Sequence, residues 1–583
     1  MKKHSYRVDA DGLHLHVVTY GDRQKTPIVL VHGYPDNHRV WHPVAEILSA
    51  RYFVIAYDVR GAGLSAAPST QADYRMQRLA EDLVAVVDAL IPGRRFHLAA
   101  HDWGSIQSWE SVTGEALRPR IASFTSISGP CLDHVGYWLR ERALSRSARQ
   151  QAQLVQQALS SWYIGFFHLP LLAPACWKAG LDQLWPRYLA RREGVSEHEP
   201  QPTQAADGYN GVQLYRANFR DKLLHPQPRY ASCPVQLIVP LRDNYVGSQL
   251  FSDLQRWVPQ LYRRDIDAGH WVLLSHPQLV AEAIDTWVSG LEKGQLPMAL
   301  QRRRVQGERQ HQPLAGQLAL ITGAGSGIGQ AIASKFADNG ADIVCVDIDA
   351  NSAERSAEWC RLLGARAWAR QTDVGSAKAM TQLARWVDEE LGGADIVVNN
   401  AGLGLAGGIL ETRLEDWERL LKVNLWGVIH GSRLFAAQMV AAHRRGHIIN
   451  VASAAAFAPH RQLTAYATSK AAVHMLSECL RAELAPYKIG VTAVCPGFVA
   501  TGIAQATVYA GLGEAEQAQM RTRAERLYRR RNFSPDEVAS AVLQALLSNR
   551  PLALVGAEAW ATRLLSRFVP QLSRRIARLD LLG

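Results

Sequence analysis

Short runs rich in β-branched residues alternate with helical stretches along most of this chain of 583 residues. Such alternation is typical of a parallel β-sheet covered by helices on both faces, so the predicted fold class is α/β. The pattern stops between Leu291 and Pro313, where the chain is rich in Gln, Arg, Gly and Glu, as exposed linkers are. The sequence therefore predicts two α/β units, which also fits a length well above the roughly 100 to 200 residues of one domain.

The predicted boundaries follow from this break. We expect a first domain over residues 1–292, a basic linker over 293–312, a second domain over 313–550 and a basic tail over 551–583. Candidate strands are apolar, β-branched runs bounded by turn residues. They are residues 28–31, 53–57, 96–100 and 235–239 in the first half, and 318–321, 343–346, 396–398, 448–451 and 491–494 in the second.

Composition narrows the class of protein. Hydrophobic residues make up 48% of the chain and charged residues 20%, which is ordinary globular usage and argues against disorder, collagen or coiled coil. The seven cysteines form no C-x-x-C pair and no cluster with zinc-ligand spacing, so we expect a reduced protein without a metal. The N-terminal segment lacks the apolar core of a signal peptide, and no apolar stretch of about 18 residues follows it. These observations predict a cytoplasmic protein without a membrane span.

The net charge of +11 is concentrated in two short segments. Residues 301–313 hold four arginines against one glutamate, and residues 521–583 hold 12 arginines against 5 acidic residues. No helix-turn-helix, zinc-finger or RNA-binding signature accompanies this charge, so nucleic acid is not a predicted partner. From Trp560 to Leu582 apolar residues alternate with arginines, which predicts a basic amphipathic stretch. Two interpretations stay open for it: docking on a membrane surface or a partner, or packing on its own domain.

The candidate strand 96–100 runs directly into the sequence His-Asp-Trp-Gly at residues 101–104, before a helical stretch. Asp102 is therefore the centre of a small-x-nucleophile-x-small turn, which holds its side chain out at the carboxyl end of the sheet. Ser105 comes three residues after Asp102, which is too late for this turn. As a rival nucleophile it would need a small residue where Gln107 stands.

A catalytic acid and a histidine should follow the nucleophile in chain order, and both are present. Asp243 comes just after the candidate strand 235–239, and His270 follows a later strand. Upstream, Tyr34 follows another strand end, and its backbone N–H and that of Trp103 form a predicted oxyanion hole. The first half thus predicts an aspartate nucleophile served by an acid and a histidine base.

With these residues the first half resembles the α/β-hydrolase superfamily over about residues 5 to 290, and its aspartate nucleophile resembles the epoxide hydrolase and haloalkane dehalogenase branch. The resemblance implies a helical cap at about residues 131–226 with two tyrosines that hydrogen-bond the epoxide oxygen; the matching positions are Tyr163 and Tyr215. It implies an alkyl ester on Asp102 that is hydrolysed to a vicinal diol. Two alternatives stay open: a dehalogenase, whose His-Gly-x-Pro motif also occurs here, and an esterase that uses Ser105.

A glycine-rich loop follows the candidate strand 318–321 and leads into a helix. Gly323, Gly327 and Gly329 allow the tight turn and the close backbone approach that a pyrophosphate at a helix N-terminus requires. Asp347 ends the next strand, 24 residues after Gly323, where a carboxylate accepts hydrogen bonds from the adenosine ribose and repels a 2′-phosphate. The sequence therefore predicts NAD as the cofactor in preference to NADP.

Tyr466 and Lys470 are spaced i, i+4 on one face of a predicted helix, so the ammonium is expected to lower the pKa of the phenol from about 10. With Asn424 and Ser453, this pair makes the second half resemble the short-chain dehydrogenases/reductases over about residues 313–550. The resemblance implies that these four residues are catalytic, with Ser453 binding the substrate oxygen and Asn424 supporting a proton-relay water. It also implies a homo-oligomer and a cofactor site whose further residues are Ser326, Ile328, Asp373, Val374, Asn400, Ala401, Gly402, Pro496, Gly497 and Thr501.

The order of the two halves resembles that of mycobacterial EphD-type bifunctional proteins. It implies an enzyme whose first site opens a lipophilic epoxide and whose second site oxidises an alcohol or reduces a ketone. A further alternative stays open, a scaffold protein that binds NAD without turnover.

Overall fold

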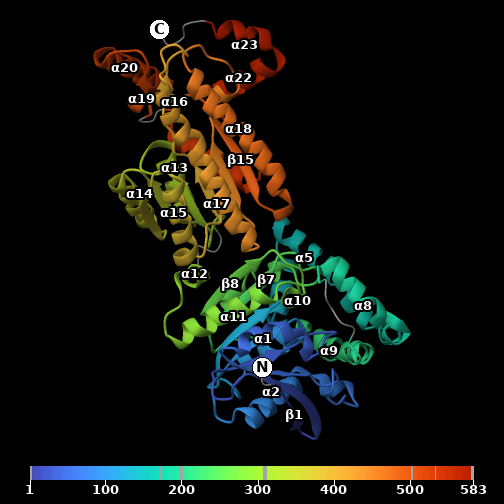
Figure 1. Cartoon of the computed structure of the whole chain (residues 1–583). Helices are drawn as coiled ribbons and strands as arrows, with labels where there is room; N and C mark the ends of the chain where they lie inside the picture. Colours follow the sequence, from blue (N-terminus) through green and yellow to red (C-terminus); the bar gives the residue numbers. More distant parts are fainter. Residues whose placement is uncertain are drawn as a thin grey trace. The chain divides into compact units, whose positions relative to one another are not determined.

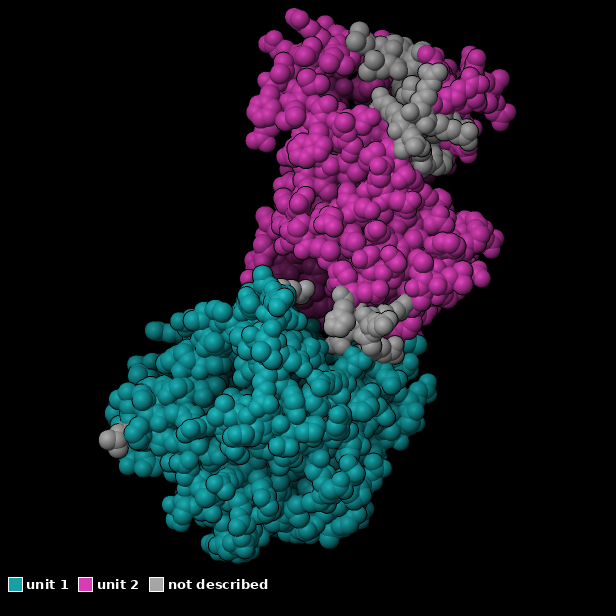
Figure 2. Space-filling model, turned by 180° about the vertical axis from the view of Figure 1, so that it is seen from behind, with its two compact units in different colours: residues 1–305 teal, residues 306–583 magenta. Residues whose placement is uncertain are grey.

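The computed structural model describes residues 3–170, 172–195, 201–305, 312–499, 503–531 and 533–578. The chain divides into two compact units, residues 1–305 and 306–583, which Figure 2 colours separately. Each unit is built on one large β-sheet. Among the described helices, none combines the length and apolarity that crossing a bilayer requires.

Unit 1 contains an eight-stranded sheet in the order β1-β2-β4-β3-β5-β6-β7-β8. β2 pairs antiparallel with both of its neighbours, and the other pairs are parallel. The strands are β1 (Lys3–Ala10), β2 (Leu13–Tyr20), β3 (Pro27–Val31), β4 (Phe53–Tyr57), β5 (Phe96–His101), β6 (Ile121–Ile127), β7 (Val235–Pro240) and β8 (Leu261–Ile266). The four predicted strands are β3, β4, β5 and β7, which are buried along their whole length.

Helices cover both faces of this sheet. On one face, α2 (Met76–Leu90) and α3 (Trp103–Thr113) bury Leu83 and Trp109 in a shared apolar cluster. On the other face, α1 (His42–Ser49) and α11 (Pro277–Glu292), which follows the short α10 (Val272–Ser275), bury Leu48 and Trp287. The sheet is therefore the middle layer of three, as the alternating sequence pattern predicts.

The predicted helical cap lies between β6 and β7. Its helices are α4 (Leu132–Leu144), α5 (Ala148–Ser160), α6 (Trp162–Phe167), α7 (Leu172–Cys176), α8 (Asp182–Tyr188) and α9 (Gln204–Leu224). α9 is tied to the core by Asp207, whose carboxylate accepts hydrogen bonds from the backbone N–H of Gly63 and the side chain of Asn37. The cap is thereby held over the carboxyl ends of the strands.

Unit 2 contains a seven-stranded sheet in the order β11-β10-β9-β12-β14-β15-β17, and every pair is parallel. The strands are β9 (Leu318–Thr322), β10 (Asp342–Asp347), β11 (Ala367–Gln371), β12 (Ile396–Asn399), β14 (His447–Val451), β15 (Gly490–Pro496) and β17 (Leu552–Val555); β13 (Leu405–Ala406) pairs with β16 (Val508–Tyr509). The strand order reverses between β9 and β12. In doubly wound sheets, such a switch point opens a crevice at the carboxyl ends of the strands.

Helices again form a layer on each face (Figure 1). Phe336 of α13 (Gly327–Asp338), Cys360 of α14 (Ala350–Leu362) and Val542 of α21 (Pro535–Leu547) belong to one apolar cluster. Val428 of α17 (Gly427–Ala441) and Val473 of α18 (Thr464–Leu484) belong to another. The remaining helices are α15 (Ala377–Leu391), α16 (Leu414–Leu421), α19 (Ile503–Ala506), α20 (Glu514–Arg531), α22 (Ala557–Phe568) and α23 (Pro570–Ile576).

Two predicted boundaries differ from the structure. Part of the expected linker belongs to unit 1: Leu300 in α12 (Met298–Gln301) is fully buried, and the N–H of Val305 donates to the carbonyl oxygen of Leu261 in β8. The expected tail also starts too early, because β17 pairs with β15 as an edge strand of the unit 2 sheet. Each segment has only a few apolar residues between polar ones, so the sequence pattern did not indicate a helix or a strand there.

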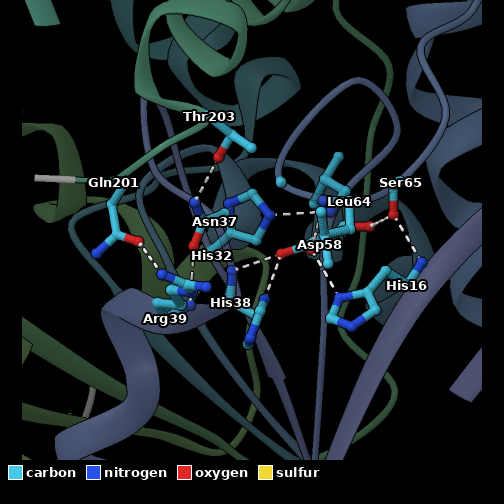
Figure 3. Close-up of polar contacts among 12 residues, drawn as sticks. His16, His32, Asn37, His38, Arg39, Asp58, Leu64, Ser65, Gln201 and Thr203 are labelled. Atoms are coloured by element: carbon cyan, nitrogen blue, oxygen red, sulfur yellow. Dashed lines mark hydrogen bonds and ion pairs between the residues drawn. The ribbon is translucent and has the colours of Figure 1, made fainter. Parts of the chain in front are cut away.

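Asp58, at the end of β4, joins three separate segments of unit 1 (Figure 3). His16 and His38 donate to its two carboxylate oxygens through Nδ1 at 2.9 and 2.6 Å, and the N–H groups of His38 and Leu64 donate at 2.8 and 2.9 Å. Burial by itself would raise the pKa of Asp58, but the bonds from both histidines hold it well below its usual range. The three side chains offer ligand atoms within 4.8 Å of one another, as metal sites do. The hydrogen bonds already account for their arrangement.

We expect Asp58→Asn to destabilise unit 1. An amide cannot accept four hydrogen bonds, and its N–H₂ group would face a donor, so the free energy of unfolding should fall by about 3 kcal/mol. The measurement is the unfolding transition of unit 1 in calorimetry or denaturant titration. Asp221→Asn, which changes an exposed carboxylate on α9, is the matched control. An Asp58→Asn transition equal to that of the control would contradict this account.

Candidate active sites

Asp102 lies on a strained turn between β5 and α3. Its φ of 50° and ψ of −124° fall outside the ordinary allowed regions for a residue with a side chain. The turn is also crowded, because a Cβ added at Gly104 would lie 2.3 Å from the carbonyl oxygen of Val31. This contact is the physical reason for the small residue that the motif requires after the nucleophile.

Ser105, the alternative nucleophile, lies beneath this turn. Its side chain is fully buried, and its hydroxyl donates to the carbonyl oxygen of Gly129 at 2.7 Å and contacts the hydroxyl of Ser126 at 2.8 Å. A hydroxyl engaged in this way does not point toward a substrate. The structure therefore gives the esterase alternative no support.

The structure brings Asp102, Asp243 and His270 together. Nδ1 of His270 lies 2.8 Å from Oδ2 of Asp243, and Nε2 lies 3.5 Å from Oδ1 of Asp102. The other oxygen of Asp243 accepts the N–H groups of Tyr245 and Val246 at 2.8 and 2.9 Å. Asp243 is thus fixed by its own loop and orients the imidazole toward Asp102.

The buried carboxylates and the imidazole shift one another's pKa values. Burial would lower the pKa of His270, but the charges and hydrogen bonds of Asp243 and Asp102 hold it well above its usual value. Burial would raise the pKa of Asp102, but the hydrogen bond and charge of His270 lower it. The resting site therefore favours an ionised Asp102 beside a protonated His270.

The predicted oxyanion hole faces the other oxygen of Asp102. The backbone N–H of Tyr34 donates to Oδ2 of Asp102 at 2.8 Å. Gly33 leaves room for this contact, because a Cβ there would lie 2.5 Å from the Asp102 side chain. The N–H of Trp103 belongs to the same turn, and its part in the oxyanion hole stays a prediction.

The two cap tyrosines meet above Asp102. Tyr163 on α6 and Tyr215 on α9 have ring centres 6.1 Å apart, and the Tyr215 ring lies 4.9 Å from that of Trp103. Burial raises the pKa of both phenols, and the negative charge of Asp102 raises them further. Both hydroxyls are therefore protonated at neutral pH and able to donate.

Sequence reasoning missed two residues close to His270. The ring of Tyr245 lies 5.1 Å from that of His270 and 5.4 Å from that of Tyr163, and its hydroxyl bonds that of Tyr188 on α8. Asp36 accepts a hydrogen bond from the indole N–H of Trp271 at 2.8 Å, and burial raises the pKa of Asp36 to about 7. The only available signal was the position of Tyr245, two residues after Asp243.

In unit 2, the glycine-rich loop follows β9. It is held by hydrogen bonds from the segment that follows the neighbouring strand β12. Gly323 and Gly327 have positive φ angles of 64° and 56°. A Cβ on Gly329 would lie 2.1 Å from the carbonyl oxygen of Gly323. The side chain of Asn400 donates to the carbonyl oxygens of Thr322 and Gly323 at 3.0 and 3.1 Å. The backbone is therefore shaped and locked in the way that a bound pyrophosphate requires.

The other predicted cofactor residues border the same crevice. Ser326 precedes α13 as its N-cap, so Ile328 lies in the first turn, where backbone N–H groups are free of partners within the helix. At the end of β10, Oδ2 of Asp347 accepts the N–H of Gly325 at 2.9 Å. A Cβ on Gly325 would lie 2.8 Å from this oxygen. The glycine-rich loop and the carboxylate beside it fit the phosphates and ribose of a nicotinamide dinucleotide.

Asp373 and Val374 follow β11. The carboxylate of Asp373 accepts from Lys422 at 3.0 Å and from the N–H of Gly375 at 2.9 Å, so its position is fixed. Val374 is buried and packs against Gly427. A Cβ added to Gly427 would lie 2.8 Å from Cγ2 of Val374. The contacts of these two residues with a cofactor stay predictions.

Tyr466 and Lys470 share one face of α18, but their charges differ from the expectation. Nζ of Lys470 lies 5.9 Å from the centre of the Tyr466 ring and donates to the carbonyl oxygen of Val451 at 2.9 Å. Burial raises the pKa of Tyr466, and a hydrogen bond with Ser453 offsets only part of this. Burial lowers the pKa of Lys470 to about 8. The pKa of the phenol is therefore raised and not lowered as expected, because burial outweighs the hydrogen bond with Ser453.

Asn424 lies in a π-helical turn, η8 (Lys422–Trp426), between α16 and α17. Its Oδ1 accepts the N–H of Leu403 at 2.7 Å, and its Nδ2 donates to the carbonyl oxygen of Leu403 at 3.0 Å. A Cβ on Gly402 would lie 3.4 Å from Oδ1 of Asn424 and 3.5 Å from Nζ of Lys470. Asn424 and Lys470 therefore converge on Gly402, while the proton-relay water stays a prediction.

The last predicted cofactor residues lie at strand ends. The N–H of Ala401 donates to Oγ1 of Thr322 at 3.1 Å, and Pro496 ends β15. Gly497 follows and lies beside the side chain of Glu558 in α22. Thr501 falls outside the described residues.

Comparison with known proteins identifies both halves. A family model described as alpha/beta hydrolase fold matches residues 26–277, and one described as short chain dehydrogenase matches residues 317–510. The chain is 38% identical to "Probable oxidoreductase EphD" of Mycobacterium tuberculosis over 98% of this chain and 97% of that protein. It is 35% identical to 2,3-dihydro-2,3-dihydroxybenzoate dehydrogenase of Bacillus subtilis over 40% of this chain and 88% of that protein.

A solved short-chain dehydrogenase/reductase from Burkholderia phymatum, in complex with NAD, is 32% identical and covers 44% of this chain and 95% of its own, with a TM-score of 0.42. The full-length similarity and the two family models cover both units. The chain therefore belongs to the same family as EphD, and it joins an α/β-hydrolase fold to a short-chain dehydrogenase.

Proposed function

We propose that the chain is a bifunctional enzyme with one reaction in each unit. Unit 1 hydrolyses a lipophilic epoxide to a vicinal diol through an ester on Asp102. Unit 2 uses NAD to oxidise an alcohol or reduce a ketone. One observation carries the proposal for unit 1: the two oxygens of the Asp102 carboxylate are divided between the N–H of Tyr34 and the imidazole of His270. A cytoplasmic location and a homo-oligomer stay predictions.

Each oxygen of Asp102 has its own role in the first step. Oδ2 already accepts the N–H of Tyr34, so Oδ1 is the oxygen that attacks a ring carbon of the epoxide. The ring C–O bond breaks as the new C–O bond forms, and the alkoxide takes a proton from Tyr163 or Tyr215. Because burial keeps both phenols protonated, either can donate that proton.

Formation of the ester prepares His270 for the second step. The charge of Asp102 is one of the two that raise the pKa of His270, and an ester is neutral. His270 then gives up its proton, which returns to the tyrosine that has lost one. Neutral His270 can take a proton from water, and the hydroxide attacks Cγ of Asp102 while the N–H of Tyr34 holds the oxyanion at Oδ2. Collapse releases the diol, which takes its proton from His270, and the acid left on Asp102 restores the ion pair.

The cap supports an epoxide rather than an alkyl halide as the substrate. A halide leaves as a stable anion, whereas an opened epoxide leaves as an alkoxide that needs a proton. Tyr163 and Tyr215 place two protonated phenols over the nucleophile, where such a proton is required.

Unit 2 contains the residues for hydride transfer between NAD and a carbinol carbon. The loop at residues 323–329 and Asp347 would hold NAD, which supplies the hydride acceptor when bound. The Ser453 hydroxyl would bind the substrate oxygen, and the Tyr466 hydroxyl would exchange the proton of that oxygen. A hydrogen bond between Ser453 and Tyr466 supports this pairing, and burial keeps the phenol in its protonated form.

Replacing one reactive side chain should silence one reaction only. Asp102→Asn removes the attacking carboxylate and should lower epoxide hydrolysis at least about 1000-fold, while NAD turnover is unchanged. Tyr466→Phe should have the reverse effect, because the two residues lie in separate units. Diol formation from epoxides of increasing chain length and NADH absorbance with secondary alcohols are the two measurements. Loss of both activities from either substitution would contradict the proposal.

His270→Gln should trap the ester. The substituted protein can still be alkylated at Asp102, but it has no base to activate water. Mass spectrometry of the intact protein should show a gain equal to the mass of the epoxide, located in the peptide that contains Asp102. Asp102→Asn serves as the control and should gain no mass. Unchanged turnover of His270→Gln without an adduct would show that this histidine is not the base.

Asp347→Ala should relax the preference for NAD. Removing the carboxylate removes its repulsion of a 2′-phosphate, so the ratio of kcat/KM for NADP to that for NAD should rise at least about tenfold. Asp349→Ala is the matched control, because this neighbouring carboxylate caps α14 through the N–H of Asn351. A wild-type enzyme that already prefers NADP would refute the role assigned to Asp347.

A further inference from the structure

A surface that is both apolar and basic covers the last two described helices, α22 and α23. Its large apolar side chains are between 44 and 70% exposed, and its arginines lie on the same two helices and just after them. We call it the tail face; it consists of Trp560, Leu564, Phe568, Val569, Leu572, Arg563, Arg567, Arg574, Arg575 and Arg578.

The tail face is not explained by packing on its own domain. The residues that α22 and α23 bury are small: Ala559 is fully buried and Ser573 is 7% exposed. Leu565 and Ile576 are partly buried, whereas the apolar residues of the tail face are turned outward, and Phe568 is 70% exposed. Both helices therefore leave the apolar residues of the tail face for another surface, which favours docking over packing on their own domain.

The spacing on α22 places charge directly beside the apolar stripe. One apolar stripe is formed by residues spaced four apart, Trp560, Leu564 and Phe568. It is flanked by Arg563, three residues after Trp560, and by Arg567, three residues after Leu564. Long arginine side chains next to exposed aromatic rings are typical of helices that lie in the headgroup region of a bilayer. A contact between protein copies would not require this concentration of one charge.

The charge of this segment selects an anionic partner. Residues 557–578 hold five arginines and one acidic residue, Glu558. Glu558 lies on the inner side of α22, next to Gly497, so its charge is turned away from the tail face. The exposed charge is therefore positive, which complements the phosphates of anionic lipids.

The tail face borders the dehydrogenase site. α22 packs against η9 (Ala454–Ala456), which follows Ser453 directly, and the guanidinium of Arg563 lies 5.8 Å from the ring centre of Phe457. The side chain of Arg461 donates to the carbonyl oxygen of Arg578 at 3.3 Å. Figure 1 shows α22 and α23 together at one end of unit 2. A membrane bound here would lie beside the loop that follows the proposed substrate ligand.

We propose that the tail face docks on the surface of an anionic lipid bilayer, with its apolar residues among the headgroups and its arginines on the lipid phosphates. The alcohol or ketone substrate of unit 2 is then a lipid that reaches the site from the bilayer. This second statement rests on the function proposed for unit 2, whereas the docking itself does not.

Vesicle flotation of the full chain tests the docking. Wild-type protein should bind vesicles of phosphatidylcholine mixed with phosphatidylglycerol at least about tenfold better than vesicles of phosphatidylcholine alone, and salt should weaken the binding. Arg574→Gln/Arg575→Gln and Trp560→Ser/Phe568→Ser should each lower binding to the mixed vesicles at least about fivefold.

Matched controls change equally exposed residues elsewhere in unit 2. Lys378→Gln/Arg385→Gln on α15 and Trp359→Ser/Leu362→Ser on α14 should bind vesicles as the wild type does. Equal loss in the controls, or no binding of wild-type protein to the mixed vesicles, would overturn the proposal. A second result would also overturn it: Trp560→Ser/Phe568→Ser converts a dimer to a monomer in sedimentation, and the wild-type protein does not bind vesicles. The tail face would then be a contact between copies.

Turnover measured on the same proteins separates this inference from the proposed function. The tail-face variants should oxidise a short, water-soluble secondary alcohol as fast as the wild type. With a long-chain alcohol in the mixed vesicles, the same variants should lose at least about fivefold in kcat/KM. If no alcohol or ketone is turned over while vesicle binding persists, the function proposed for unit 2 fails and the docking stands. If the long-chain reaction is unaffected by the variants, delivery from the bilayer fails.

Discussion

Both candidate sites depend on one geometric constraint: parallel strands all end at the same edge of their sheet. In unit 1, the chain leaves β3, β5, β7 and β8 at that edge and there places Tyr34, Asp102, Asp243 and His270. In unit 2, the glycine-rich loop, Asp347, Asn400, Ser453 and Pro496 lie at or just beyond the ends of β9, β10, β12, β14 and β15. Residues far apart in the sequence meet because the sheet aligns the strand ends. The loops that carry these residues can therefore be short.

This constraint explains why so much could be predicted from the sequence. A motif that follows a buried β-branched run must lie at the carboxyl edge of the sheet. The run therefore predicts the α/β fold, and its order relative to the motif predicts where the site lies. The family models confirm the predicted α/β-hydrolase and short-chain dehydrogenase folds. Two of the strands that escaped prediction lack such runs: β1 has exposed residues at most positions, and β17 has only four residues in a segment taken for a tail.

The contacts that could not be predicted come from tertiary packing without a sequence signal. Nothing in the sequence pairs Tyr245 with Tyr188 of the cap or Asp36 with Trp271, although both pairs border His270. The cluster around Asp58 draws on three separate segments. The spacing of Tyr466 and Lys470 gives their common helix face, but it does not show that Val451 accepts the hydrogen bond of the lysine.

Burial has opposite consequences in the two sites, and this difference suits their reactions. Around His270, two carboxylates overcome the cost of burying charge, so the site holds an ion pair that lasts only while Asp102 is ionised. In the proposed mechanism, esterification removes the charge of Asp102, so the pKa of His270 falls and the neutral histidine can act as a base. Around Tyr466, burial is the largest cause of the pKa shifts, and it moves both the phenol and Lys470 toward their neutral forms. A neutral phenol is the form that donates a proton, and in the proposed reaction Tyr466 exchanges its proton with the substrate oxygen.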